Sequence, residues 1–344
     1  MKATTLTSIS CAAALAVSTL AVPAAAEEYP RMNLRMAHSF PSDWTQTEVD
    51  QWWADEIRER SDGQIRINIM WAGAGGEPGE ILRLVRRGAV DLGAVPPAYN
   101  PDDLPLTSAP NALPLGFREN ETAIKVINGI IEEAPEVQQE LRDNNVWPLY
   151  FHTLNGYQPL CTKPIRNMDD WDGVRIRTFG AWQAHLWDAL GAVGVDVQTA
   201  DKYEALQRGQ IDCGYFSTDL YVQTGIYEVG DYLMDFDFGP VATWPIWVNY
   251  EAWQDYPENV RELIMEVSAE AEQRSLEAEQ ASGEESLQYM LDHGIELVEF
   301  EEPDKLREAA PNFREMWLEQ MKEEGRGEGA QAVYDYWMEH DDTL

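Results

Sequence analysis

Cysteine is scarce in this sequence, with three in 344 residues. Cys11 lies in an N-terminal apolar run, so only Cys161 and Cys213 belong to the rest of the chain. Two cysteines cannot build a multi-disulfide scaffold, and no C-x-x-C pair with metal-ligand spacing is present. The sequence leaves open whether Cys161 and Cys213 form one disulfide or remain two separate buried thiols.

Positive charge is also scarce, because 25 Lys and Arg residues stand against 61 Asp and Glu, which gives a formal net charge of -36. Lysine is the rarer cation; beyond the N-terminal segment it occurs only as Lys125, Lys163, Lys202, Lys305 and Lys322. An acidic surface of this kind repels nucleic acid and anionic membranes. It favours a protein that works at high salt, where ions screen self-repulsion, over an ordinary acidic exported protein.

Long apolar runs are absent except near the N-terminus. Lys2 provides a positive start, small apolar residues follow over about 9–22, and Ala24-Ala25-Ala26 fits the A-x-A cleavage pattern. A membrane anchor is the alternative, but the run is short for a bilayer span. We therefore expect a signal peptide over 1–26 and a mature chain that begins at Glu27. That chain is expected to be free and soluble in an exported compartment, with no membrane insertion.

The motifs of common catalytic sites are missing. The histidines are scattered, none forms H-E-x-x-H, and neither a G-x-S-x-G elbow nor a G-x-x-x-x-G-K-[ST] loop is present. The glycine-rich segment 73–79 follows a predicted strand, but its glycines do not match G-x-G-x-x-G and Glu77 would repel a pyrophosphate. We therefore expect neither an enzyme nor a bound cofactor or metal ion.

The sequence does contain a repeated alternation of strands and helices. In the first half, strands are predicted at 34–37, 65–69 and 90–95, and helices at 45–60 and 80–87. In the second half, strands are predicted at 174–177, 195–197 and 211–215, and helices at 182–190 and 202–208. Each half carries one R-G-x-[VI]-D-x-G motif, at 87–93 and at 208–214. This repetition predicts an α/β fold of two similar lobes, each a mostly parallel sheet flanked by helices.

The remaining segments are expected to connect the two lobes. Residues 241–250 predict a strand that returns between them, residues 257–291 one long helix, and residues 295–300 a further strand. We expect lobe 1 to comprise 27–153 and 243–282, and lobe 2 to comprise 154–242 and 283–344. Hinge strands and the long shared helix would join them.

Arg177 is the strongest candidate for a ligand contact. It lies at the C-terminal end of a predicted parallel strand, where open α/β sheets place their ligands. Its planar guanidinium suits a carboxylate, although a surface Arg paired with one of the many acids is an equally good reading of its position. Several aromatic residues follow nearby strand ends and make an aromatic-lined cleft plausible.

In their order, these segments resemble the solute-binding proteins of tripartite ATP-independent periplasmic (TRAP) transporters. The resemblance extends over nearly the whole mature chain. It rests on L-R-M-A-H at 34–38, S-D-G-Q-I at 61–65, L-V-R-R-G-A-V-D at 84–91, A-P-N-A-L-P at 109–114, K-P-I at 163–165, D-G-V-R-I-R at 172–177, L-G-A at 190–192, Y-E-A-L-Q-R-G-Q-I-D at 203–212, V-N at 248–249 with Trp253, and P-E at 257–258.

The resemblance implies a periplasmic receptor, expected to be monomeric, that closes on a small organic solute and delivers it to membrane permease subunits. It also implies that Arg177 matches the family's carboxylate-binding Arg. The sequence departs from the pattern at Gln158, where a second Arg is frequent, and near Phe216, where Asn is common.

Two ligand types therefore stay open. A small carboxylate is ranked first because Arg177 is retained, and a small amine or zwitterion held by aromatic and acidic side chains comes next. A ligand sensor for a membrane signalling partner is a further alternative. The candidate ligand-binding residues are Arg177, Phe216, Tyr215, Gln158, Tyr157, Trp182, Glu77, Asp219, His38 and Trp244.

Overall fold

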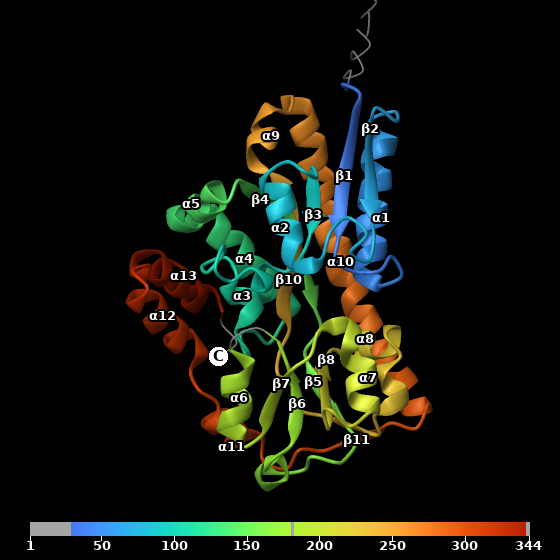
Figure 1. Ribbon diagram of the computed structural model, residues 1–344, viewed down its shortest axis with the longest axis vertical. Coiled ribbons are helices and arrows are strands. Elements are labelled where there is room, and N and C mark those ends of the chain that lie inside the picture. The colour runs from blue at the N-terminus through green and yellow to red at the C-terminus, as the bar shows by residue number, and fades with distance from the viewer. Residues whose placement is uncertain (1–28, 180–181, 342–344) are drawn as a thin grey trace, which may run out of the picture.

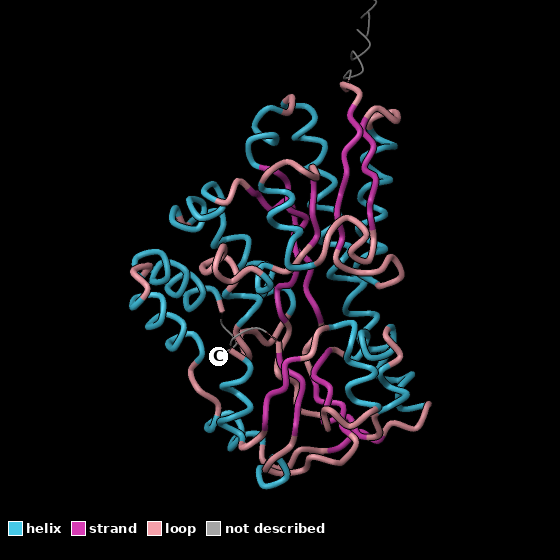
Figure 2. Tube along the Cα trace, viewed as in Figure 1, coloured by secondary structure: helices cyan, strands magenta, loops and turns pink. Residues whose placement is uncertain are grey.

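The protein has two lobes stacked along its long axis (Figure 1), as seen in a computed structural model that describes residues 29–179 and 182–341. The two groups of strands are separate, one in each lobe (Figure 2). The expected signal peptide lies outside the described residues. Within the described ranges, no helix combines the length and the apolar composition needed to cross a bilayer.

The sheet of the first lobe has the strand order β2 (Ile65–Met70), β1 (Met32–His38), β3 (Leu92–Ala94), β10 (Val241–Asn249) and β4 (Val146–Leu154). The sheet of the second lobe has the order β11 (Glu296–Val298), β9 (Tyr232–Met234), β5 (Gln158–Cys161), β8 (Cys213–Phe216), β6 (Arg175–Thr178) and β7 (Val193–Asp196). Both sheets contain the predicted parallel strands around β1 and β6, but both are mixed. The difference arises because β10 and β5 each run antiparallel to two neighbours.

Helices cover the sheets of both lobes. Those of the first half are α1 (Thr45–Arg60), α2 (Pro78–Arg86), α3 (Ala109–Ala112), α4 (Asn120–Glu133) and α5 (Pro135–Asp143). Those of the second half are α6 (Gln183–Leu190), α7 (Lys202–Gln207) and α8 (Thr218–Gln223), and the C-terminal part forms α9 (Tyr250–Asp255), α10 (Glu258–Asp292), α11 (Pro303–Ala309), α12 (Phe313–Glu323) and α13 (Gly327–His340). Short 3-10 turns add η1 (Pro97–Tyr99), η2 (Met168–Trp171), η3 (Thr199–Asp201) and η4 (Ile226–Val229).

The long helix α10 joins the lobes, as the sequence predicts. Its 35 residues extend for about 52 Å at 1.5 Å per residue. It packs on α1 and β4 in the first lobe and on α8 in the second (Figure 1). Its buried face is partly polar: Ser268 accepts a hydrogen bond from the Trp53 indole at 3.0 Å. The helix is therefore held by specific hydrogen bonds as well as by apolar packing.

The repeated R-G-x-[VI]-D-x-G motif performs the same structural task in each lobe. Gly88 and Gly209 end α2 and α7 with φ of 66° and 65°, a conformation that favours glycine. The Asp of each motif then accepts a hydrogen bond from the backbone N–H of the neighbouring parallel strand. Asp91 binds Arg35 N at 2.7 Å, and Asp212 binds Arg175 N at 2.9 Å. The motif thus ends a helix and fixes the following strand beside its parallel neighbour.

Cys161 and Cys213 form a disulfide, the pairing that the sequence left open. The two residues are directly opposite each other on β5 and β8. The bond therefore ties together two strands that are 52 residues apart in the chain.

The C-terminal helices pass from one lobe back to the other. Helix α11 packs on α6, whereas α13 packs on α4 and α5, where Trp337 stacks on Phe117 with ring centroids 4.7 Å apart. Several segments therefore cross the boundary, and the division into 27–153 with 243–282 and 154–242 with 283–344 stays a prediction.

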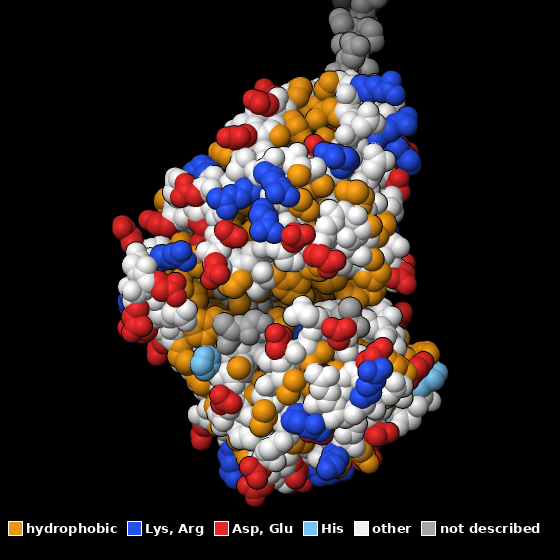
Figure 3. All heavy atoms as spheres, in the orientation of Figure 1, with side chains coloured by type: hydrophobic (Ala, Val, Ile, Leu, Met, Phe, Trp, Pro, Cys, Tyr) orange, Lys and Arg blue, Asp and Glu red, His pale blue; other side chains and the backbone are white. Residues whose placement is uncertain are grey.

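The acidic composition predicts that stability rises with salt. Acidic side chains are spread over both lobes on the visible face (Figure 3), and their mutual repulsion weakens as ions screen it. The melting temperature is expected to increase by several degrees from low salt to molar NaCl, measured by differential scanning calorimetry. A melting temperature that stays flat or falls would contradict the high-salt interpretation.

Candidate ligand-binding site

A cavity lies between the lobes, where a groove crosses the middle of the molecule with hydrophobic side chains along its upper edge (Figure 3). The cavity volume is about 380 Å³, part of which is open to solvent. First-lobe elements contribute Phe40, Trp44, Pro96, Tyr99, Asn111, Leu154, Thr243 and Trp244. The second lobe and its connections contribute Tyr157, Arg177, Phe179, Thr199, Phe216 and Leu220.

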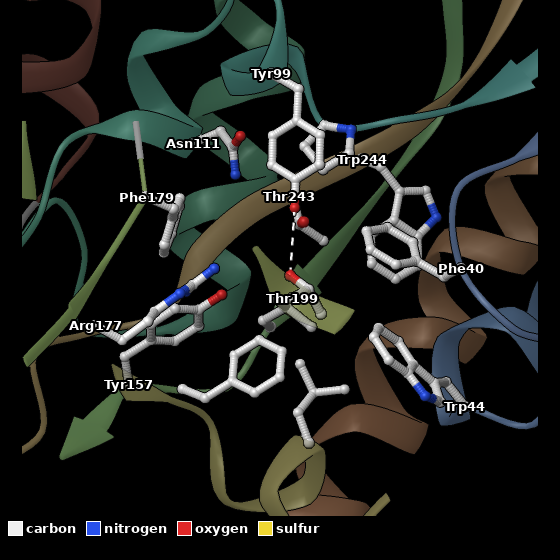
Figure 4. A pocket seen from close by; sticks show the side chains of 14 residues that line it. Phe40, Trp44, Tyr99, Asn111, Tyr157, Arg177, Phe179, Thr199, Thr243 and Trp244 are labelled. Carbon is white, nitrogen blue, oxygen red and sulfur yellow. Dashed lines mark hydrogen bonds between the residues drawn. The ribbon is translucent and has the colours of Figure 1, made fainter. Parts of the chain in front are cut away.

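Arg177 is the charged side chain of this cavity. It is 2% exposed, and its guanidinium points into the cavity beside Tyr157 (Figure 4). Nε donates to Val197 O at 3.2 Å and Nη1 to Tyr215 O at 3.3 Å, while the guanidinium carbon lies 4.2 Å from the Phe179 ring centroid. No carboxylate of the described residues lies within 4.0 Å of it. Burial lowers the pKa of Arg177 below its ordinary value.

An unpaired buried guanidinium is costly, so an anion bound at this position would be strongly favoured. The two carbonyl oxygens fix its orientation without neutralising its charge. Nη2 has no hydrogen-bond partner among the described residues, which leaves a donor for such an anion.

Aromatic rings form most of the cavity wall. Phe40 stacks on Trp44 with centroids 5.0 Å apart and lies 4.3 Å from the Trp244 ring. From the second lobe, Tyr157 meets Phe216 edge to face at 5.8 Å. Tyr99 Oη and Thr199 Oγ1 approach within 3.5 Å across the cavity (Figure 4), so the two lobes touch there.

The structure brings four of the candidate residues to the cavity: Arg177, Phe216, Tyr157 and Trp244. Tyr215 and Gln158 lie next to it with their side chains directed elsewhere. The Tyr215 ring packs on Trp187 at 4.8 Å, and Gln158 Nε2 donates to Met234 O at 3.1 Å.

The other four candidates do not line the cavity. Trp182 packs near His185, and Glu77 is exposed at the N-terminus of α2. Asp219 and His38 are both fully buried, each in a separate polar network. Their role in ligand binding stays a prediction.

Sequence reasoning missed several lining residues that follow strand ends. Phe40 comes two residues after β1, Tyr99 ends the turn after β3, and Thr199 begins the turn after β7. The rule that singled out Arg177, that ligands bind beyond the C-terminal ends of parallel strands, applies equally to these three strands. Asn111, whose amide nitrogen faces the cavity in Figure 4, lies in the A-P-N-A-L-P segment.

His38 belongs to a buried network centred on Asp50, just behind the cavity wall. His38 Nε2 and His152 Nε2 each lie 2.8 Å from an Asp50 oxygen, and Tyr150 Oη also donates to Asp50. The Phe40 N–H donates to His38 Nδ1 at 3.0 Å, so the His38 proton is on Nε2. Although burial alone raises it, the pKa of Asp50 is held well below its ordinary value by His152 and His38. Trp244, which lines the cavity, donates to the same carboxylate at 3.4 Å.

Asp219 belongs to a second buried network, where the two lobes meet α10. Gln46 of α1 donates to both Asp219 and Glu279, and Asn155 N donates to Glu279 Oε1 at 2.8 Å. Asn155 Nδ2 reaches Asp219 Oδ1 at 3.4 Å. Burial raises the pKa of both carboxyl groups, and Asp219 raises that of Glu279 further. No cation of the described residues pairs with either group.

This acid pair predicts greater stability at mildly acidic pH. The folded state keeps a proton on Glu279 that the unfolded state releases above its ordinary pKa of 4.5, so stability falls as pH rises from there towards the raised pKa. One proton gives a slope of up to about 1.4 kcal/mol per pH unit. Glu279→Gln is expected to flatten this slope, measured by urea unfolding over a pH series. Glu285→Gln, at an exposed position of α10, is the control that should leave the slope unchanged.

Comparisons with known proteins agree with this architecture. The family model of bacterial extracellular solute-binding proteins, family 7, matches residues 36–324. A protein of Albidiferax ferrireducens described as a solute-binding protein is 22% identical over 267 residues, covering 71% of this chain and 74% of its own.

Two solved structures share the fold at low sequence identity. An extracytoplasmic solute receptor of Bordetella pertussis that binds pyroglutamic acid superposes with a TM-score of 0.76 at 20% identity, covering 89% of this chain and 99% of its own. A TRAP periplasmic solute-binding protein of Pseudomonas putida F1 with bound D-glucuronate also has a TM-score of 0.76 at 20% identity, covering 91% and 97%.

The molecule has two α/β lobes that share the helix α10 and have a cavity between them. This is the architecture of a two-lobed solute-binding receptor. Within that class, the chain belongs to the bacterial extracellular solute-binding proteins of family 7. It is therefore a binding protein and not an enzyme, as the lack of catalytic motifs predicts.

Proposed function

We propose that this receptor captures a small organic acid in the periplasm and delivers it to a TRAP-type membrane permease. The observation that supports an acid is Arg177, a buried guanidinium that faces the cavity and has no carboxylate partner among the described residues. A ligand carboxylate would supply the missing charge in a bidentate arrangement.

The charges around the cavity also favour an acid over an amine. An amine site would combine the aromatic walls with a carboxylate. Of the two acids considered for that role, Glu77 is exposed on α2 and Asp219 is engaged with Gln46 and Asn155. No Asp or Glu is among the residues that line the cavity.

The size of the cavity favours a short acid. Its aromatic walls stand close together, and Tyr99 Oη lies 3.5 Å from Thr199 Oγ1 across it. Larger acids would require the aromatic walls to move apart. Similar receptors are described with pyroglutamic acid and with D-glucuronate, and both of these ligands carry one carboxylate.

A thermal-shift screen tests the proposal. The purified receptor is heated with acetate, propionate, pyroglutamate, D-glucuronate, choline and glycine betaine. A true ligand at 100 times its dissociation constant stabilises the folded state by about 2.7 kcal/mol. We expect at least one carboxylate to raise the melting temperature while choline does not. A shift with choline or glycine betaine alone would overturn the assignment to organic acids.

The lobes are expected to close around the ligand. The cavity is enclosed by residues of both lobes, while the chain crosses between them on short connections next to β4 and β10, which suits hinge closure. Small-angle X-ray scattering should give a smaller radius of gyration with a confirmed ligand than without it. An unchanged radius at saturation would count against closure.

A further inference from the structure

A buried lysine lies behind the cavity wall. Lys202, the first residue of α7, is 1% exposed, and its Nζ has no hydrogen-bond partner among the described residues. Nζ lies 2.7 Å from the ring centroid of Phe216. Since Phe216 lines the cavity and its ring also lies 5.8 Å from the Arg177 guanidinium carbon, one aromatic ring adjoins the amine, the guanidinium and the ligand space.

No acidic group on the elements packed against Lys202 forms an ion pair with its amine. Helix α7 packs on η3, η4 and β8. The titratable groups of these elements are Asp201 on η3, Tyr227 and Glu228 on η4, and Tyr215 on β8. None of these lies within ion-pair distance of the amine, and Glu228 instead accepts from Tyr203 Oη at 3.4 Å. Burial, and to a smaller extent the nearby Arg177, lower the pKa of Lys202 well below its ordinary value.

We propose that Lys202 is the proton-binding group of the ligand site, and takes up a proton when an anion enters the cavity beside Arg177 and Phe216. In the ligand-free site, a second full charge next to Arg177 is disfavoured because no acid balances it. A bound carboxylate supplies the opposite charge, and the Lys202 amine accepts a proton from solvent. The receptor then binds an acid together with one proton, and its affinity falls as pH rises. This inference rests on the proposed function, since it requires an anionic ligand.

The first test uses the ligand-free protein. Only five lysines lie beyond the N-terminal segment, so selective labelling of lysine side chains gives few NMR signals. We expect one of them to titrate at clearly lower pH than the others over about pH 6 to 11, and to vanish in Lys202→Met. Lys125→Met, at an exposed position, should remove a signal that titrates normally. Titration of all signals together near 10.5 would overturn the proposal, and this result does not depend on whether the variant folds.

The second test adds acetate and pyroglutamate as probes. In the wild type we expect either anion, once bound, to move the Lys202 titration to higher pH. Calorimetry in buffers of different ionisation enthalpy should then show uptake of up to one proton, with affinity falling by up to about tenfold per pH unit. Lys202→Met should abolish both effects, and Lys125→Met should keep them.

The outcomes separate the two proposals. If a probe raises the melting temperature but leaves the Lys202 signal and the proton count unchanged, proton uptake is excluded and the organic-acid function stands. If no carboxylate in the screen binds, the proposed function fails and the coupling fails with it. Proton uptake that persists in Lys202→Met would assign it to another group and contradict the role of Lys202.

Discussion

Arg177→Ala is expected to lower the affinity for a carboxylate by about 100-fold or more, because removing one partner of a buried ion pair costs about 3–5 kcal/mol. Arg177→Lys should also bind poorly, since an ammonium cannot reproduce the planar fork that Val197 O and Tyr215 O hold in place. Isothermal titration calorimetry with the acid that gives the largest thermal shift measures both changes.

Two controls make this result specific. Arg175 lies on the same strand, but its side chain pairs with Asp212 at 2.6 Å outside the cavity, so Arg175→Ala should retain ligand affinity. Phe216→Ala should weaken a carboxylate less than Arg177→Ala does. The opposite order would indicate an amine ligand, and near-normal binding by both variants would place the ligand site elsewhere.

Asp50→Ala is expected to destabilise the protein by about 3–5 kcal/mol, because it removes the common acceptor of a buried network. Four donors would lose their partner at once: His38, His152, Tyr150 and Trp244. Urea unfolding at neutral pH measures the loss. The lowered pKa of Asp50 also predicts that this contribution is present above pH 3.8 and is lost as pH falls through the lowered value.

The matched control is Asp55→Ala on the same helix. The Asp55 side chain is 47% exposed and pairs with the exposed Arg58 and with Gln51, so its removal should cost less than about 1 kcal/mol. An equal effect of the two variants would show that the Asp50 network contributes little. Because Trp244 bonds Asp50 and lines the cavity, Asp50→Ala should also weaken ligand binding.

The secondary structure was largely predictable because its signals are local. The helix expected at 45–60 is α1, and the strands expected at 65–69 and 174–177 agree with β2 and β6 to within one residue. Strands β4, β5 and β9 were not predicted. Strands β5 and β9 are four and three residues long, so hydrophobic periodicity has too few positions to reveal them. Strand β4 is nine residues long, but it is buried on both faces and so lacks the alternation that marks a half-buried strand.

The candidate site was predictable where chain position alone decided it. Arg177 and Phe216 lie near the ends of the parallel strands β6 and β8, whereas Tyr157 precedes β5 and Trp244 lies within the antiparallel strand β10. The acids considered as ligand contacts do not line the cavity. Charge and sequence distance cannot tell that Asp219 turns towards Gln46 and α10, since that direction depends on how two separate lobes pack against one helix.

The sequence by itself determined the α/β alternation, the paired motifs at Gly88 and Gly209, the long helix and the acidic surface, because each follows from local conformational preference or from composition. Only the tertiary structure decided which charges are left unbalanced. In a chain with 61 acidic residues, the isolation of Arg177 and Lys202 from every described carboxylate is set by burial and by contacts among β6, β7, β8 and α7. Burial makes such an imbalance costly, and an anion in the cavity relieves it.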